Sequence, residues 1–358
     1  MRICYSKVEV LPDQGLLKNI EVAGRVCYKS EDKITETSAA AFVDMIRRRE
    51  HYSVLEHGSI YLKVPKDYPI PFIEMPWCHI EVKDNFKYIY TNLRYVVEVQ
   101  PELADAILAG DPLPQEVEFF TPDINDPYKR FSVRIITNFK ISEQYVRHRV
   151  FSHSKESSRY CNYSKQKFNS ELTFIIPQHF ATYFNYLEGK IEGIDDKWYF
   201  TPGSTYEDAV IQEEALRRLY NMWPHEGDKT VINVLDEAPS LHKLLSRCKL
   251  AELDYLEDIA EGFKPEEARD YLTLFAKTEQ VMTGFLKDWE DMLIKRRSAP
   301  AQSEARFIAN NIHLKLHKLT NKSDQKTSDY DKLWLDDLGD NMAELMRRVG
   351  INRVRLDD

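Results

Sequence analysis

The sequence predicts an α+β fold, because segments with strand patterns and segments with helix patterns follow one another along the chain. Residues 60–64 alternate apolar and polar side chains, which is typical of a half-buried strand. Residues 131–137 alternate well enough for a core strand, and residues 172–176 form another predicted strand that Pro177 ends. The remaining predicted elements are helices, over residues 14–28, 36–49, 206–222, 239–260, 277–297, 303–319 and 329–348.

Length and charge narrow the class of protein. The 358 residues suffice for one large domain or two, and 43% of them are hydrophobic, which is ample for a core. The net charge is −9, whereas a protein dedicated to duplex nucleic acid usually has a basic domain. We therefore expect small ligands that are bound locally, and no nucleic-acid partner.

The cysteines and the start of the sequence favour a cytoplasmic protein. The five cysteines are odd in number, they form no C-x-x-C pair, and no His/Cys cluster suggests zinc. We interpret them as reduced thiols, and Cys161 as a packing residue. The sequence shows no signal-peptide pattern and no apolar run near the ~18 residues of a membrane span. We expect neither a bound metal nor a membrane partner.

In the N-terminal third of the chain, the sequence pattern predicts a polar turn between a helix and a strand. In the helix at 36–49 three arginines occupy the last turn, where cations complement the helix dipole. Residues 51–58 then form a polar turn before the strand at 60–64. From residue 65 to residue 126 prolines mark loops, and Asn92 is the predicted N-cap of a short helix.

Residues 144–160 form the most informative segment. They contain four Arg or Lys and two His against one carboxylate, in a chain that is otherwise acidic. Gln144, Arg147, His148 and Phe151 are spaced as one face of a helix, and the serines that follow are expected on a turn. Arginine and hydroxyl donors match phosphate oxygens, which predicts a phosphorylated ligand. A solvated basic helix followed by a polar loop is the alternative interpretation.

The predicted helix at 277–297 ends in an arginine with two possible roles. Arg296 takes the next position on a continuous apolar stripe at helical spacing. A guanidinium on the core-facing side needs either a partner or a path to water. It either reaches solvent beside the C-terminal dipole, or lines a cleft and donates to a ligand carbonyl. The stripe comprises Thr278, Val281, Met282, Phe285, Leu286, Trp289, Met292 and Leu293.

Three separated segments resemble one known family. R-H-R at 147–149, followed after seven residues by Ser157 and then by R-Y at 159–160, resembles the signature of the flavin-dependent thymidylate synthases, the ThyX family. H-Y-S-V-L-E-H at 51–57 is similar to a flavin-binding segment of that family. E-E-A-R at 266–269 is similar to an element whose arginine binds the nucleotide.

The resemblance implies a fold and a reaction. The fold would be ThyX-like, with an antiparallel or mixed central sheet flanked by helices. It would form a single catalytic domain over residues 1–358, with loop and helical insertions near 65–126 and 180–235. The reaction would be the reductive methylation of dUMP to dTMP in de novo dTMP biosynthesis, with carbon from methylenetetrahydrofolate and hydride from FAD that NADPH reduces. The family builds its sites between the subunits of a homotetramer, so we expect that assembly.

Carried over by position, the resemblance also implies residue roles. The implied FAD ligands are Ser53, Glu56, Arg147, His148, Arg149 and Lys155. The implied dUMP ligands are Gln144, Arg147, Ser157, Ser158, Arg159, Arg269 and Arg296. Arg296 is also the implied catalytic residue, because its donors would favour charge build-up on the pyrimidine as the ring carbon attacks.

Departures from the family pattern leave two alternatives. Thr273 stands where the family usually has a proline. Four positions where some members contact flavin carry different residues in this chain, namely Phe285, Lys287, Asp291 and Pro300. One alternative is a related flavin and folate enzyme that adds a hydroxymethyl group to dUMP. The other is a non-catalytic protein that binds single-stranded RNA, suggested by the Arg, His and Tyr residues of 144–167.

Overall fold

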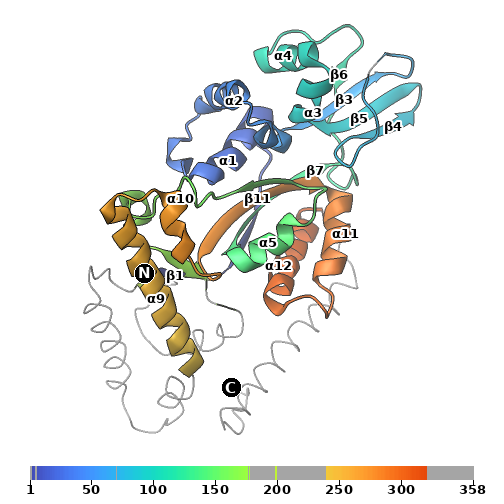
Figure 1. Ribbon diagram of the computed structural model, residues 1–358. Helices are drawn as coiled ribbons and strands as arrows, with labels where there is room; N and C mark the ends of the chain where they lie inside the picture. Colours follow the sequence, from blue (N-terminus) through green and yellow to red (C-terminus); the bar gives the residue numbers. More distant parts are fainter. Residues whose placement is uncertain are drawn as a thin grey trace. The chain divides into compact units, whose positions relative to one another are not determined.

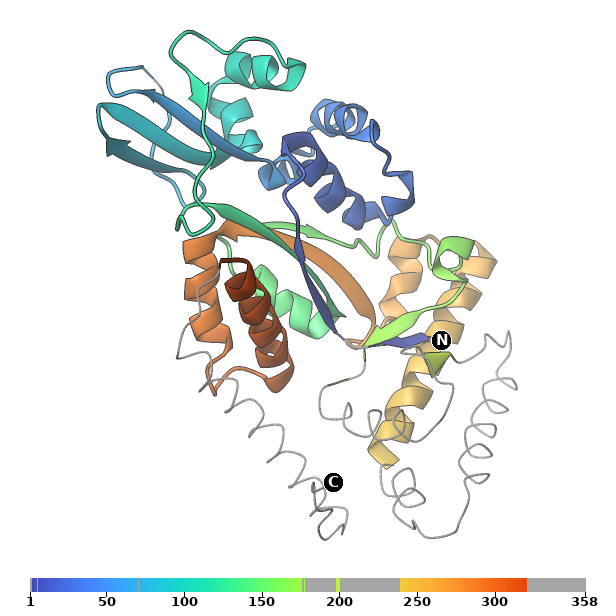
Figure 2. The same ribbon diagram turned by 180° about the vertical axis from the view of Figure 1, so that it is seen from behind.

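The computed structural model of the chain describes residues 2–4, 6–69, 71–175, 177, 198–199 and 239–320. The chain divides into two compact units, shown in Figure 1 and, from behind, in Figure 2. The first unit comprises Met1–Tyr5, Asn162–Lys277 and Asn321–Asp358, and the second comprises Ser6–Cys161 and Thr278–Thr320. Both units mix helices with strands, so the predicted α+β class is confirmed. The assignment of the whole chain to one catalytic domain stays a prediction.

A four-stranded sheet organises the second unit. Its strand order is β2 (Lys7–Leu11), β7 (Arg130–Asn138), β11 (Lys277–Phe285) and β8 (Ser152–Lys155). β2 pairs antiparallel with β7, and β8 pairs antiparallel with β11. Helices α5 (Phe139–Val146), α11 (Leu286–Arg296) and α12 (Ser303–Thr320) cover one face, as Figures 1 and 2 show, and share its core with β7 and β11.

The other face of this sheet is covered as well. α1 (Leu16–Tyr28) packs there, with Ala23 and Val26 against Val281 of β11. Met282, the next residue of the strand, belongs to the core on the helix side. Successive residues of a strand point to opposite faces, so β11 is buried on both. This double burial explains why its sequence lacks the alternation of a half-exposed strand.

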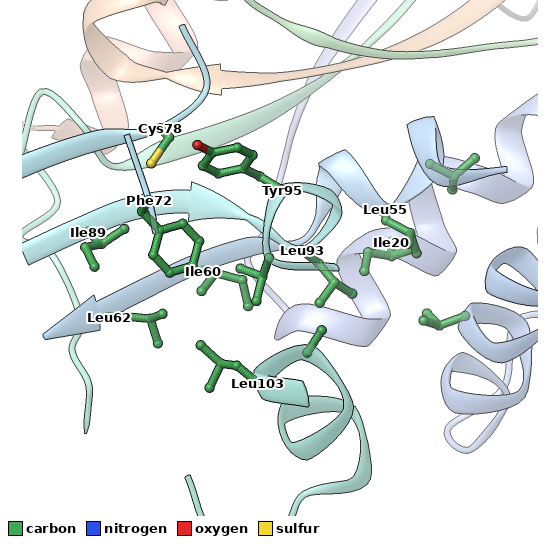
Figure 3. Close-up of a cluster of buried hydrophobic side chains, with 14 of the residues drawn as sticks. Ile20, Leu55, Ile60, Leu62, Phe72, Cys78, Ile89, Leu93, Tyr95 and Leu103 are labelled. Carbon is green, nitrogen blue, oxygen red and sulfur yellow. The ribbon is translucent and has the colours of Figure 1, made fainter. Parts of the chain in front are cut away.

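A second sheet of this unit has three of its four strands within residues 65–126, where the sequence predicted loops and a short helix. Its order is β4 (His79–Lys83), β5 (Phe86–Asn92), β3 (Ser59–Pro65) and β6 (Glu118–Phe119), and every pairing is antiparallel. Helices α3 (Leu93–Val99), α4 (Pro101–Ala109) and α2 (Ser38–Arg48) contribute to its core, together with the 3-10 helix η2 (Tyr52–His57). Figure 3 shows part of this core, including Phe72, Tyr95 and Cys78. β4, β5 and β6 were not predicted from the sequence.

The remaining elements of the second unit and those of the first are shorter. The second unit also contains the 3-10 helix η1 (Glu31–Lys33). In the first unit, β1 (Arg2–Cys4) lies between β10 (Trp198–Tyr199), its antiparallel neighbour, and β9 (Thr173–Ile175), its parallel neighbour. The sheet of this unit is therefore mixed. Its helical segments are η3 (Gln166–Phe168), α9 (Pro239–Glu261), α10 (Pro265–Ala268) and η4 (Arg269–Tyr271).

Several predicted elements are confirmed. The helices at 14–28, 36–49, 239–260 and 303–319 correspond to α1, α2, α9 and α12, and the strands at 60–64, 131–137 and 172–176 to β3, β7 and β9. The Asn92 side chain accepts a hydrogen bond from the Tyr95 amide at 3.0 Å, which confirms the predicted N-cap. The predicted helices at 206–222 and 329–348 lie outside the described residues, as does most of the insertion predicted near 180–235.

The single predicted helix at 277–297 is wrong in its first half. Residues 277–285 form β11, and the helix begins only at Leu286. All residues from Thr278 to Phe285 are buried, so the alternation of a half-exposed strand is absent, and Val281, Met282 and Phe285 also match helical spacing. From Leu286 onward the predicted stripe is confirmed, because the buried residues of α11 are Leu286, Trp289, Met292 and Leu293.

Gly284 of β11 generates a prediction about stability. A Cβ at this position would lie 2.4 Å from Cδ1 of Phe151, whose ring packs at 4.5 Å on that of Trp289. We expect Gly284→Ala to lower the free energy of unfolding by about 1–3 kcal/mol, because the packed ring must move. Urea unfolding followed by circular dichroism measures this change. In a Phe151→Leu background the same substitution should cost less, and an equal cost in both backgrounds would contradict the steric explanation.

Candidate functional site

The basic segment 144–160 changes from helix to strand midway. α5 ends at Val146 with Arg147 as its C-cap, so only Gln144 of the predicted helical face lies on the helix. His148 lies in the turn that follows, and β8 begins at Ser152. The helical face predicted through Phe151 is therefore wrong. Pairing of β8 with β11 and burial of Phe151 in the core override the helical spacing.

Arg296 joins this segment from α11. Its Nε donates to Nε2 of His148 at 2.8 Å, and its Nη2 donates to the carbonyl oxygen of Gln144. Its guanidinium also lies 5.8 Å from the ring centroid of Tyr145. Three of the predicted ligand residues are thus brought together, although Arg296 is 148 residues from His148.

His148 is neutral in this arrangement. Burial, followed by the positive charge of Arg296, lowers its pKa to about 4. Since an arginine Nε can only donate, Nε2 of His148 must be the acceptor, and the proton belongs on Nδ1. The carbonyl oxygen of His148 in turn accepts from Nε2 of His153 at 3.1 Å. This network fixes both the ring orientation and the tautomer of His148.

Glu56 is held by two arginines that the sequence did not single out. Nη1 of Arg94, on α3, donates to its carboxylate at 2.5 Å, and Nη1 of Arg130, on β7, donates to its backbone carbonyl at 2.8 Å. Arg130 is buried, and its Nη2 also donates to Oγ of Ser152 at 3.1 Å. Buried charges require such partners. In the sequence, Arg94 lies in the predicted short helix after Asn92 and Arg130 directly before the predicted strand at 131–137, and neither pattern reveals a distant partner.

Glu56 and Arg149 line a cavity of about 160 Å³ between η2, α3 and the start of β8. Arg147 and Arg149 are exposed, and among the described residues neither side chain has an ion-pair or hydrogen-bond partner. Such arginines are available to an anionic ligand. The other lining residues are Trp77, Asn92, Arg94, Tyr95, Glu98, Val150, Phe151 and Ser152.

A larger and more open cavity of about 530 Å³ contains three further predicted residues. Ser53, Lys155 and Ser157 line it, from η2, β8 and the turn after β8. The rings of Tyr28 and Tyr160, 5.7 Å apart, form an aromatic wall that the sequence did not assign to the site. The other lining residues are Cys27, Glu50, His51, Tyr52, Val54 and Arg94.

The chemistry of this larger cavity fits a phosphorylated aromatic ligand. Serine hydroxyls, an ammonium group and tyrosine rings supply donors for phosphate and faces for stacking. Burial raises the pKa of the Cys27 thiol, so this cysteine stays protonated at neutral pH and is a poor nucleophile. The site is suited to binding and orienting a ligand rather than to covalent catalysis by the protein.

The remaining predicted residues lie elsewhere. Ser158 is half-buried and Arg159 is exposed, both in the turn after β8, and the guanidinium of Arg159 lies 5.5 Å from the ring centroid of Tyr160. Arg269 is half-buried at the start of η4 in the first unit. Its assignment to the nucleotide stays a prediction. Thr278–Thr320 and the basic segment share the second unit, where Arg296 contacts His148 and Gln144.

No group of three or more His, Cys, Asp or Glu side chains is placed to hold a metal ion within the part of the chain that the structure describes. In the same residues, none of the helices combines the length and the apolar composition that crossing a bilayer requires.

The buried histidine that follows Glu56 in the sequence leads to a prediction about how stability depends on pH. His57 is 1% exposed, its Nδ1 lies 2.7 Å from Oγ1 of Thr283, and its Nε2 has no partner among the described residues. Burial, then the charges of Arg130 and His153, lower its pKa from 6.5 to about 3. Below about pH 6.5 the unfolded chain binds a proton that the folded protein does not, so stability falls as pH decreases toward 3.

We expect His57 alone to remove about 2 kcal/mol from the free energy of unfolding between about pH 7 and pH 5. Urea unfolding of the wild type and of His57→Gln at both pH values measures this contribution. The variant should lose less stability than the wild type on acidification. Equal losses in the two proteins would contradict the assignment.

The basic segment lies within the part of the chain that matches a known protein family. A family model described as Thy1, thymidylate synthase complementing protein, matches residues 129–320. This is more than half of the chain, and it includes β7, α5, β8, β11 and α11.

Among solved structures, a UMP/dUMP methylase, PolB, from Streptomyces cacaoi is similar to this chain in two ligand-bound forms. The form with 5-Br dUMP is 14% identical, with a TM-score of 0.37, over 89% of this chain and 93% of that chain. The form with 5-Br UMP is 13% identical, with a TM-score of 0.36, over 88% of this chain and 91% of that chain. No curated protein sequence matches this chain.

Proposed function

Because the chain belongs to the thymidylate synthase complementing protein family, we propose that it is a flavin-dependent thymidylate synthase. Family membership supports an enzyme that acts on dUMP. In the proposed reaction dUMP is reductively methylated to dTMP, with methylenetetrahydrofolate as carbon donor and NADPH as the source of reducing equivalents. The observation that carries this proposal is the hydrogen-bonded contact of Arg296 with His148 and Gln144, which brings the implied catalytic arginine to the R-H-R segment.

In this proposal the chain holds FAD through residues of both cavities. Ser53 and Lys155 face the larger cavity, Glu56 and Arg149 the smaller one, and Arg147 and His148 lie in the turn between α5 and β8. When bound, FAD supplies the hydride chemistry that no side chain here can perform. The protein contributes binding, orientation and a fixed arrangement of charges.

The proposed nucleotide ligands belong to the second unit, apart from Arg269 of η4, which belongs to the first. Gln144, Arg147 and Arg296 come from α5, its C-cap and α11, and Ser157, Ser158 and Arg159 from the turn after β8. Hydroxyl and guanidinium donors suit the phosphate of dUMP. A guanidinium also suits the carbonyl groups of the pyrimidine ring.

Arg296 has the catalytic role in this proposal. Its Nη2 donates to the backbone carbonyl of Gln144, and a pyrimidine carbonyl would take the place of that acceptor. Neutral His148 keeps the guanidinium oriented by accepting from Nε, so little reorganisation is needed when the substrate binds. As the ring carbon of the pyrimidine attacks, the guanidinium bonded to the ring carbonyl would stabilise the charge that develops on the ring.

The hydroxymethyl alternative has one structural observation in its favour. Two positions where some family members contact flavin are engaged with each other, because Nζ of Lys287 donates to Asp291 at 2.9 Å on the exposed surface of α11. A third, Phe285, is buried with its ring 5.7 Å from that of Tyr128. The flavin contacts of this chain would therefore differ from those of such members. Mass spectrometry of the product separates a methyl from a hydroxymethyl group.

We also propose that the chain acts as one catalytic domain and assembles as a homotetramer with sites shared between subunits. Membership of the family supports this assembly, because the resemblance implies a homotetramer with sites between subunits. Gel filtration with light scattering measures the assembly, and a monomer that is fully active would contradict it.

Arg296 provides the test of the proposed activity. Purified wild-type protein should show flavin absorbance after addition of FAD, and release dTMP from dUMP when methylenetetrahydrofolate and NADPH are supplied. We expect Arg296→Ala to lower kcat by about 100-fold or more, because a donor that acts mainly on the transition state is lost. Anaerobic turnover with quantified dTMP measures the effect.

The matched control is Arg48→Ala, an exposed arginine of α2 whose ion pair is with Asp44, one helical turn away. It should leave kcat unchanged, because exposed pairs of this kind contribute little to stability. Colourless wild-type protein that stays inactive after FAD is added would overturn the proposed function. Wild-type activity in Arg296→Ala would overturn only the assigned role.

A further inference from the structure

Arg94 is common to the linings of the two cavities. It lies on α3, outside the residues 129–320 that match the family model, and it lines both the cavity of about 160 Å³ and the cavity of about 530 Å³. The smaller cavity also contains Arg149 and Glu56, and the larger one contains Lys155 and Ser53. A cation at this position reaches ligands in either cavity.

The backbone of α3 is firmly anchored. Leu93, Tyr95 and Val96 are buried in the core of the second sheet, where Figure 3 shows the first two. Asn92 caps the helix through the Tyr95 amide. Arg94 lies between these anchors, with its side chain 39% exposed. The position of its Cα is therefore set by the core, while its guanidinium stays accessible to a ligand.

Two carboxylates orient the guanidinium and leave part of it available. Nε donates to Oε1 of Glu98 at 2.8 Å, and Nη1 donates to Oε1 of Glu56 at 2.5 Å. Nη2, with two N–H groups, has no acceptor among the described residues. Because the planar group is already fixed, binding a further oxygen through Nη2 costs little side-chain entropy.

The charges around Arg94 indicate that it would bind an anion through directed hydrogen bonds rather than through net positive charge. Glu56 and Glu98 offset its positive charge, so its contribution to an anion is mainly the directed N–H groups of Nη2. Arg149, exposed in the same cavity, supplies an uncompensated positive charge. Guanidinium donors from two directions are the arrangement that binds the oxygens of a phosphate group.

We propose that Arg94 is a specificity-determining residue that binds a phosphate oxygen of the phosphorylated ligand at the boundary of the two cavities. The inference rests on the proposed function, and it adds a ligand contact from a segment that the family model does not cover. The phosphate belongs either to the flavin nucleotide or to the pyrimidine nucleotide. Both sources share the same chemistry and are separated by the ligands used in the test.

The test compares ligands with and without phosphate. Binding of FAD, FMN and riboflavin, and of dUMP and deoxyuridine, is measured by calorimetry on the wild type, Arg94→Ala, Arg94→Lys, Glu98→Gln and the control Arg48→Ala. We expect Arg94→Ala to weaken binding of one phosphorylated set roughly tenfold or more, the effect of losing a hydrogen bond to a charged group. Binding of the matching compound without phosphate should not change. Arg94→Lys should keep part of the affinity, and Arg48→Ala all of it.

Glu98→Gln distinguishes ligand binding from a structural role. It removes a carboxylate partner but keeps Arg94, so phosphorylated ligands should bind as tightly as to the wild type or more tightly. Equal weakening by Arg94→Ala and Glu98→Gln, or equal loss of riboflavin and FAD, would show a structural ion-pair network and overturn the proposal. Wild-type affinities in Arg94→Ala would overturn the role of Arg94 alone. A wild type that binds neither nucleotide overturns the proposed function together with this inference.

Discussion

Burial of β11 on both faces is the constraint on which the rest of the second unit depends. α1 covers one face and α5, α11 and α12 cover the other, so polar side chains of this strand must find partners inside the protein. Gln280 accepts from Ser142 of α5 at 2.9 Å, and Thr283 contacts Ser132 of β7 and His57 of η2, each at 2.7 Å. These contacts connect the strand to α5, β7 and η2.

The same strand positions both ends of the basic segment. On its edge, β11 pairs with β8, so Ser152–Lys155 is held in register opposite Gln280–Thr283. At its C-terminus it leads directly into α11, whose last residue is Arg296. One rigid connection therefore determines where β8 and Arg296 lie, and His148 is held between them. Such a mount on strands and helices is more precise than one on loops.

Arginines organise this site in two ways. Arg130 is buried and binds the backbone carbonyl of Glu56, which is a structural role. Arg94 and Arg296 are only partly buried, and each combines a contact that fixes its plane with a donor directed at an oxygen or available for one. Neutral His148 and protonated Cys27 surround these cations without adding charge, because burial disfavours their ionised forms. Local positive charge in an acidic protein thus rests on guanidinium groups and Lys155.

The sequence by itself determined the elements with a local cause, together with the family signature. Alternation in β3, the N-cap at Asn92 and the apolar stripe of α11 arise from neighbouring residues, so they could be predicted. Tertiary structure alone decided the strand at 277–285, the end of α5 at Val146 and the partners of Glu56. Arg94 and Arg130 lie 38 and 74 residues from Glu56, and β11 is a strand because two layers of helices cover it. Contacts at such separations depend on which faces the folded chain brings together, and no periodicity in the sequence encodes them.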